Sequence, residues 1–125
     1  MTRPKTYRYL AKIQEAAGII ISYVENLDYE SFKSDLKTQD AVMMRLVSIG
    51  ELVNHLIEHD INFINNNPQI PWNAIRGLRN KIAHDYFGID SRMLFETART
   101  SIPQLAAIMP ELILKTAERA PQAGA

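Results

Sequence analysis

Cysteine is absent from all 125 residues of the chain. Its absence excludes a disulfide scaffold, a thiol nucleophile and any metal site built on thiolates. Long uncharged apolar runs are missing too, so we expect no segment that spans a membrane. The start of the chain carries charge without the apolar run of a signal peptide. These absences predict a cytoplasmic protein that does not enter a membrane.

An excess of charge is also lacking, because 14 Lys and Arg residues balance 14 Asp and Glu residues. Binding to nucleic acid or to anionic lipid over the whole surface is therefore not expected, and any such binding needs a local patch. Glycine and proline are few, with five and six residues. The length predicts one domain, residues 1–119, and a frayed tail, residues 120–125.

The hydrophobic pattern is helical almost throughout. Apolar residues recur at three- and four-residue steps, and no segment alternates as a strand does. The predicted main helices cover residues 7–27, about 38–60, 72–84 and about 90–102. A turn or short helical turn over residues 31–35 places Phe32 in the core. The sequence predicts an all-α fold, an antiparallel four-helix bundle with one or two extra short helices.

Polar residues, proline and glycine set the expected ends of these helices. Thr38 or Asp40 can cap the second helix, and Asp90 can cap the fourth. Pro71 is expected in the first turn of the third helix, where proline is tolerated. Gly88 is the expected C-cap of that helix.

One glycine and two prolines interrupt the helical pattern. Gly18 lies inside the first helix, where a glycine often permits close packing. Pro103 is expected to kink or divide the fourth helix, and Pro110 to start a last short helix.

Positive charge is concentrated on the third helix. Residues 61–84 contain no Asp or Glu but include Arg76, Arg79 and Lys81. A local positive field of this kind suits phosphate recognition. A solvated helix face has the same composition and is the more common case.

Helical geometry separates the side chains of this segment. At about 100° per residue, one face is apolar, with Ile75, Leu78 and Ile82. The opposite face carries Arg76, Asn80 and His84. Arg79 lies about 140° around the helix from His84. For Arg79 and His84 to act on one atom, either the helix loosens near His84 or the two groups meet between two chains related by a twofold axis.

The eight residues Arg79-Asn-Lys-Ile-Ala-His84-Asp-Tyr86 form an R-x-x-x-x-H-x-Y string. This string resembles the signature of the HEPN ribonuclease superfamily, and in particular that of the HepT-like toxins. The flanking segments look familial too: Ile49-Gly-Glu51, Pro71-Trp72, Phe87-Gly-Ile-Asp90 and Ile102-Pro103-Gln-Leu105. The resemblance covers roughly residues 7–115.

The resemblance implies a homodimeric, metal-independent endoribonuclease without a cofactor, the toxin of a type VII-like toxin–antitoxin pair acting on tRNA or mRNA. It implies Arg79 and His84 as the catalytic residues. A histidine suits removal of the ribose 2′-hydroxyl proton near neutral pH, and a guanidinium suits the charged phosphate. Asn80 could orient the imidazole or hold the substrate, and Arg76 is a further candidate for substrate binding.

Tyr86 has a second implied role. In the HepT-like branch the motif tyrosine resembles the acceptor of AMP, which a minimal nucleotidyltransferase antitoxin transfers from ATP. The added phosphate would compete with RNA beside the motif. Alternatively, Tyr86 packs at the dimer face.

Two other functions stay open at this stage. The chain could be a non-catalytic binding or dimerisation subunit of a nucleotidyltransferase, in which the basic helix only docks a phosphate. It could also be a purely structural dimer.

A rival site is the sequence His55-Leu-Ile-Glu58-His59, which matches the H-x-x-E-H pattern of inverted zinc peptidases. Such a catalytic site needs a third placed ligand and a substrate cleft, and those enzymes are much larger. We therefore expect no catalytic zinc. Incidental binding of a divalent metal by the histidine pair is more credible, and a simple solvent-exposed helix end is the most credible of the three.

Other residues have structural alternatives. Glu51 could pair with Arg45 or with an arginine of the third helix. Trp72 could stack on a base, but its position after Pro71 favours the core. Asp85 is adjacent to His84, although its side chain is expected to point elsewhere.

Overall fold

The computed structural model describes residues 4–117, and their regular secondary structure consists of helices alone. The long helices are α1 (Lys5–Val24), α3 (Leu36–His59), α5 (Trp72–His84) and α7 (Ile102–Ala117). The short elements are α2 (Tyr29–Lys33), α4 (Ile61–Asn65), the 3₁₀ turn η1 (Tyr86–Gly88), α6 (Ser91–Glu96) and the π-helical η2 (Thr97–Ser101). The prediction of an all-α bundle is confirmed. None of the described helices has the length and apolarity needed to cross a membrane. The predicted tail over residues 120–125 lies outside the described residues.

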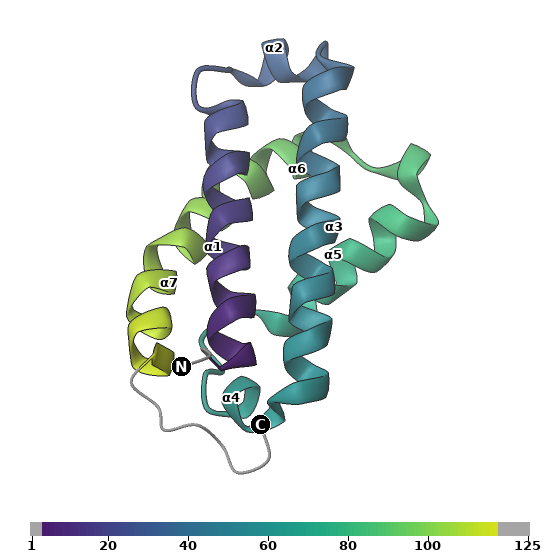
Figure 1. The fold of residues 1–125 in the computed structure, drawn as a ribbon. Coiled ribbons are helices and arrows are strands. Elements are labelled where there is room, and N and C mark those ends of the chain that lie inside the picture. Colours follow the sequence, from purple (N-terminus) through teal and green to yellow (C-terminus); the bar gives the residue numbers. More distant parts are fainter. Residues whose placement is uncertain (1–3, 118–125) are drawn as a thin grey trace.

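The bundle is built around two long helices that run side by side, α1 and α3 (Figure 1). Helix α7 packs against α1, and α5 packs against α3. The core is formed by apolar side chains of these helices and of α2, among them Leu10, Ile20, Phe32, Val42, Ile49, Val53, Leu56 and Met109. Helix α5 buries only Trp72 and Ile82 fully, so most of its surface faces outward. Its far end and η1 project beyond α3 in Figure 1.

Two predicted helix ends are wrong. Helix α3 begins at Leu36, because Asp35 caps it: the Asp35 carboxylate accepts from the Thr38 backbone N–H at 3.0 Å and from the Thr38 hydroxyl at 2.6 Å. Thr38 and Asp40 therefore lie inside the helix. Gly88 does not cap α5, which ends at His84 with Asp85 at the C-cap.

The expected effects of Pro103 and Pro110 are met in part. Helices α6 and α7 are continuous through the π-helical turns Thr97–Ser101, so an irregularity does precede Pro103. Pro110 starts no new helix and lies inside α7. Its neighbours Met109 and Leu112 are both buried, and this core packing keeps the helix continuous across the proline.

Gly18 does not lie at a close helix contact. An added Cβ atom at Gly18 would have no atom within 4 Å, and the residue is exposed. The close approach occurs instead at Gly50, in the middle of α3, where α5 crosses.

Candidate functional site

The first half of the motif is packed tightly against α3. A Cβ atom at Gly50 would lie 2.3 Å from the Cβ atom of Arg79. Only glycine therefore allows α5 to approach α3 this closely at Arg79. The Ile49-Gly-Glu51 segment noted in the sequence is thus the surface on which Arg79 rests.

Next to this contact, the Arg79 guanidinium forms an ion pair with Glu51. It also donates a hydrogen bond to the Asn80 side-chain oxygen at 3.1 Å. Its Nε is buried and has no hydrogen-bond partner among residues 4–117. Of the two partners open to Glu51, the structure selects an arginine of α5 and not Arg45. The Asn80 side chain thus contacts the guanidinium, and its expected role toward the imidazole or the substrate stays a prediction.

His84 lies at the opposite end of the motif and is exposed. Helix α5 stays regular up to this residue, and the backbone leaves helical geometry at Asp85, with φ −146° and ψ 59°. The helix thus does not loosen before His84, and no hydrogen bond joins Arg79 to His84 within the described part of the chain. The Asp85 carboxylate lies against Gly88, where a Cβ atom would meet it at 2.1 Å, so that side chain points away from the helix.

Tyr86 is attached to the bundle through Asp40. Its hydroxyl donates a hydrogen bond to the Asp40 carboxylate, 46 residues earlier on α3. This hydrogen bond, together with desolvation and the negative charge of Asp40, raises the pKa of Tyr86 above its ordinary value of about 10. The neighbouring Phe87 is 97% exposed, and its ring meets the Tyr86 ring edge-on, with 5.1 Å between centroids.

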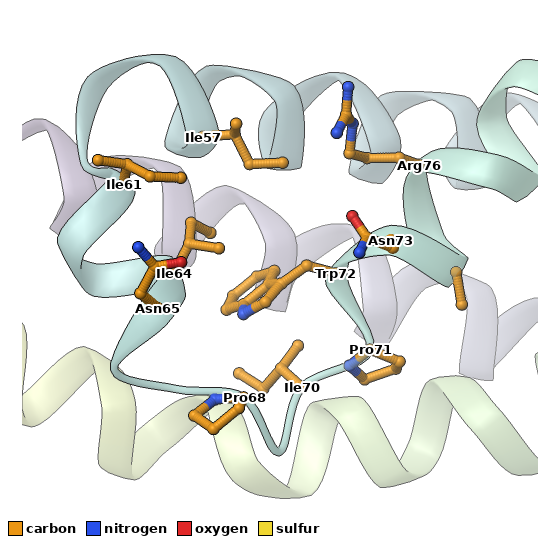
Figure 2. Close-up of a pocket in the computed structure, with 11 residues that line it drawn as sticks. Ile57, Ile61, Ile64, Asn65, Pro68, Ile70, Pro71, Trp72, Asn73 and Arg76 are labelled. Carbon is orange, nitrogen blue, oxygen red and sulfur yellow. The ribbon is translucent and has the colours of Figure 1, made fainter.

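The start of α5 forms the wall of a pocket (Figure 2). Trp72 is buried and donates from Nε1 to the Asn67 carbonyl at 3.0 Å, which confirms its core position. Arg76 lies at the rim of the pocket, and its Nε donates to the Asn54 side-chain oxygen at 2.9 Å. Arg76 precedes His84 by eight positions, a rise of about 12 Å along the helix. Arg76 therefore lies near the middle of α5, about two turns from His84.

Comparison with known proteins identifies the family of this chain. The family model described as "Ribonuclease HepT-like" matches residues 13–112. The chain belongs to the HepT-like family. A protein of Methanocaldococcus jannaschii named "Putative RNase MJ0127" is 34% identical over 113 residues, which cover 90% of this chain and 91% of that protein. The "Probable ribonuclease HepT" of Thermococcus cleftensis is 38% identical over 97 residues, 78% of this chain and 86% of that protein. The search of solved structures gave no match.

Three contacts of this HepT-like chain were not predicted from its sequence. They are the Gly50–Arg79 packing, the Asp40–Tyr86 hydrogen bond and the Asn54–Arg76 hydrogen bond. All three link α3 to the segment of α5 and η1. They connect residues that are 22 or more positions apart, which periodicity along one helix does not reveal.

Proposed function

We propose that the protein is a metal-independent endoribonuclease in which Arg79 and His84 act on one phosphodiester linkage. The observation that carries this proposal is the contrast within α5. The Arg79 guanidinium is oriented by Glu51 and Asn80, while the His84 imidazole stays open to solvent. The relatives named as ribonucleases support an RNA substrate.

The proposed chemistry needs only groups of this chain. His84 removes the proton of the ribose 2′-hydroxyl, whose oxygen attacks the adjacent phosphorus. Arg79 binds the phosphate oxygens and stabilises the charge that builds up on the phosphate. The P–O bond to the next nucleotide breaks, and the leaving 5′ oxygen takes a proton from water or from the imidazolium of His84. The products are a 2′,3′-cyclic phosphate and a 5′-hydroxyl. DNA lacks the attacking hydroxyl and is not cut by this route.

The proposed site is shared by two chains. Arg79 and His84 diverge by about 140° on one regular helix, so a twofold axis beside α5 is the simpler way to bring them together. The exposed Phe87 and an apolar groove between α5 and α7 offer surface for a partner chain. This groove is lined by Leu46, Ile75, Leu78, Met93, Leu105 and Ile108, among others.

An RNA cleavage assay with a metal chelator present tests the activity. We expect cleavage of RNA but not of DNA, products ending in a cyclic phosphate, and no cleavage by the Arg79→Ala/His84→Ala double variant. If the folded protein cleaves no RNA, the non-catalytic binding subunit becomes the better description. Cleavage that stops with the chelator would overturn metal independence.

Mixing the two single variants tests the shared site. Arg79→Ala and His84→Ala chains, unfolded and refolded together, should recover part of the activity that each lacks alone. In mixed dimers one site then holds an intact Arg79 from one chain and an intact His84 from the other. Monomeric protein by light scattering, or no recovery despite formation of mixed dimers, would contradict sharing.

We further propose that a nucleotidyltransferase antitoxin silences the protein by transferring AMP to Tyr86. The Tyr86 oxygen attacks the α-phosphorus of ATP, pyrophosphate leaves, and the phenol proton is lost. That proton is donated in a hydrogen bond to the Asp40 carboxylate in the unmodified protein, and the carboxylate or water accepts it as the oxygen attacks. The attached phosphate then adds negative charge two residues from His84.

Coexpression with such a nucleotidyltransferase tests the modification. The intact mass should rise by adenylyl units, and Tyr86→Phe should abolish the increase. Tyr23→Phe is the control, because Tyr23 lies on α1 outside the motif. A Tyr86→Phe protein that still gains this mass would place the acceptor elsewhere.

A further inference from the structure

The end of α3 carries a cluster of metal-ligating side chains that the proposed ribonuclease chemistry does not use. His55, Glu58 and His59 are all exposed, and one possible ligand atom of each lies within 4.8 Å of the others. The two histidines are four residues apart, so they lie on the same face of the helix. Their rings are nearly parallel, with centroids 6.4 Å apart and an interplanar angle of 24°.

A residue of another helix holds these two imidazoles in place. The ring of Tyr9, on α1, stacks on His55 with 5.5 Å between centroids and on His59 with 6.2 Å. Stacking occupies the faces of the imidazoles, whereas a metal binds at a ring nitrogen in the plane of the ring. The contact with Tyr9 thus restricts the rotation of both rings without covering their ligand atoms. A pre-oriented ligand pair loses less conformational entropy when it binds.

We propose that His55, His59 and Glu58 bind a divalent transition-metal ion of the Zn²⁺ type at the surface. Two imidazoles and a carboxylate suit Zn²⁺, with water as the fourth ligand of a tetrahedral site, and they do not suit Mg²⁺, which prefers oxygen ligands. The site is separate from the Arg79–His84 pair, and the proposal does not depend on the ribonuclease activity. The bound ion would link the last two turns of α3 and, through Tyr9, stabilise their packing against α1.

Calorimetric titration of the tag-free protein with Zn²⁺, combined with thermal unfolding, tests this site. We expect one Zn²⁺ per chain. At a Zn²⁺ concentration about 100 times the Kd, Tm should rise by about 10 °C. The same concentration of Mg²⁺ should leave Tm unchanged.

Matched variants locate the ligands. His55→Ala and His59→Ala should each weaken Zn²⁺ binding by about tenfold or more, and Glu58→Gln should weaken it less. His84→Ala removes the remaining histidine of the chain, and Glu15→Gln removes an exposed carboxylate of α1; both should bind Zn²⁺ like the unaltered protein. Tyr9→Phe should keep the affinity, because the phenyl ring retains the stacking, whereas Tyr9→Ala should lower it.

Because the three ligands are exposed, we expect the variants to stay folded, and circular dichroism checks that they do. Three results would overturn the proposal. One is Zn²⁺ binding in the His55→Ala and His59→Ala variants that is as strong as in the unaltered protein. Another is an unaltered protein whose Tm does not respond to Zn²⁺. Loss of binding in His84→Ala would move the site to the motif helix and equally contradict it. Because the readouts are Zn²⁺ affinity and Tm, a protein that cleaves no RNA leaves the test unaffected.

Discussion

The two ends of the R-x-x-x-x-H-x-Y motif are held in different ways. Arg79 rests on Gly50 of α3 with its guanidinium paired to Glu51, so sterics and charge together fix it. His84, five residues later, is exposed at the end of α5, and Tyr86 is attached by one hydrogen bond to Asp40. Arg79, the inner end of the motif, is part of the packing between helices. His84 and Tyr86, its outer end, lie at the surface.

Because of this difference, we expect substitutions at the two ends to affect stability and activity differently. A change at the inner end should disturb both the fold and the proposed chemistry. A change at the outer end should affect the chemistry while leaving the bundle intact. Paired substitutions at the two ends test this separation directly.

The largest effect is expected from removing the two proposed catalytic side chains. His84→Ala should lower RNA cleavage by about 10²–10⁴-fold, the usual contribution of a general base. Its unfolding free energy should change by no more than about 0.5 kcal/mol, because the residue is exposed. Arg79→Ala should lower cleavage as well, and should also destabilise the protein by about 1 kcal/mol, because the half-buried side chain packs on α3 and pairs with Glu51.

Single-turnover cleavage and urea unfolding of the same preparations measure the two quantities. Equal stability losses in both variants would show that the two ends do not differ in packing. The comparison would also fail if His84→Ala cleaved RNA at the normal rate.

Two glycines give the next largest effect. Gly50→Ala should destabilise the protein by about 1–3 kcal/mol, because the new methyl group would overlap the Arg79 side chain. Gly18→Ala is the matched control in α1, where the methyl group meets nothing and helix propensity favours alanine by about 0.5–1 kcal/mol. The midpoints of chemical denaturation of the two variants should therefore shift in opposite directions. A Gly50→Ala protein as stable as Gly18→Ala would rule out the close approach of α3 and α5.

The sequence predicts the helices well because their apolar periodicity extends over many residues. It also places Trp72 in the core, and it pairs Glu51 with an arginine of α5 as one of two alternatives. Local features are harder, because Asp35, Thr38 and Asp40 are all suitable caps and lie within six residues.

Tertiary contacts decide among such alternatives. The Gln39 side chain donates to the carbonyls of Phe32 and Lys33, at 2.8 and 3.0 Å, which ties the start of α3 to α2 and favours the earlier cap. Pro110 would end an isolated helix, but its buried neighbours keep α7 continuous. The hydrogen bond between Asp40 and Tyr86 joins the start of α3 to η1, and no pattern in the sequence predicts it.

The smallest effect is expected at the outer end, in the titration of Tyr86. The Asp40 carboxylate accepts a hydrogen bond from the protonated phenol, which raises the pKa of Tyr86. The contact is therefore fully present below a pH of about 10, the ordinary tyrosine pKa, and is lost as the pH rises through the raised pKa. Asp40→Asn removes the negative charge, so the pKa of Tyr86 should fall towards its ordinary value.

Near-ultraviolet phenolate absorbance measures this shift when the titration of Tyr86→Phe is subtracted from that of each protein with Tyr86 intact. Asp28→Asn is the control, because Asp28 caps α2 and its carboxylate accepts from the Ser31 backbone, away from Tyr86. Since one exposed hydrogen bond is involved, thermal unfolding near neutral pH should barely change in Asp40→Asn. A Tyr86 titration that is unchanged in Asp40→Asn would mean that η1 is not held by Asp40, and that the outer end of the motif has no fixed contact with α3.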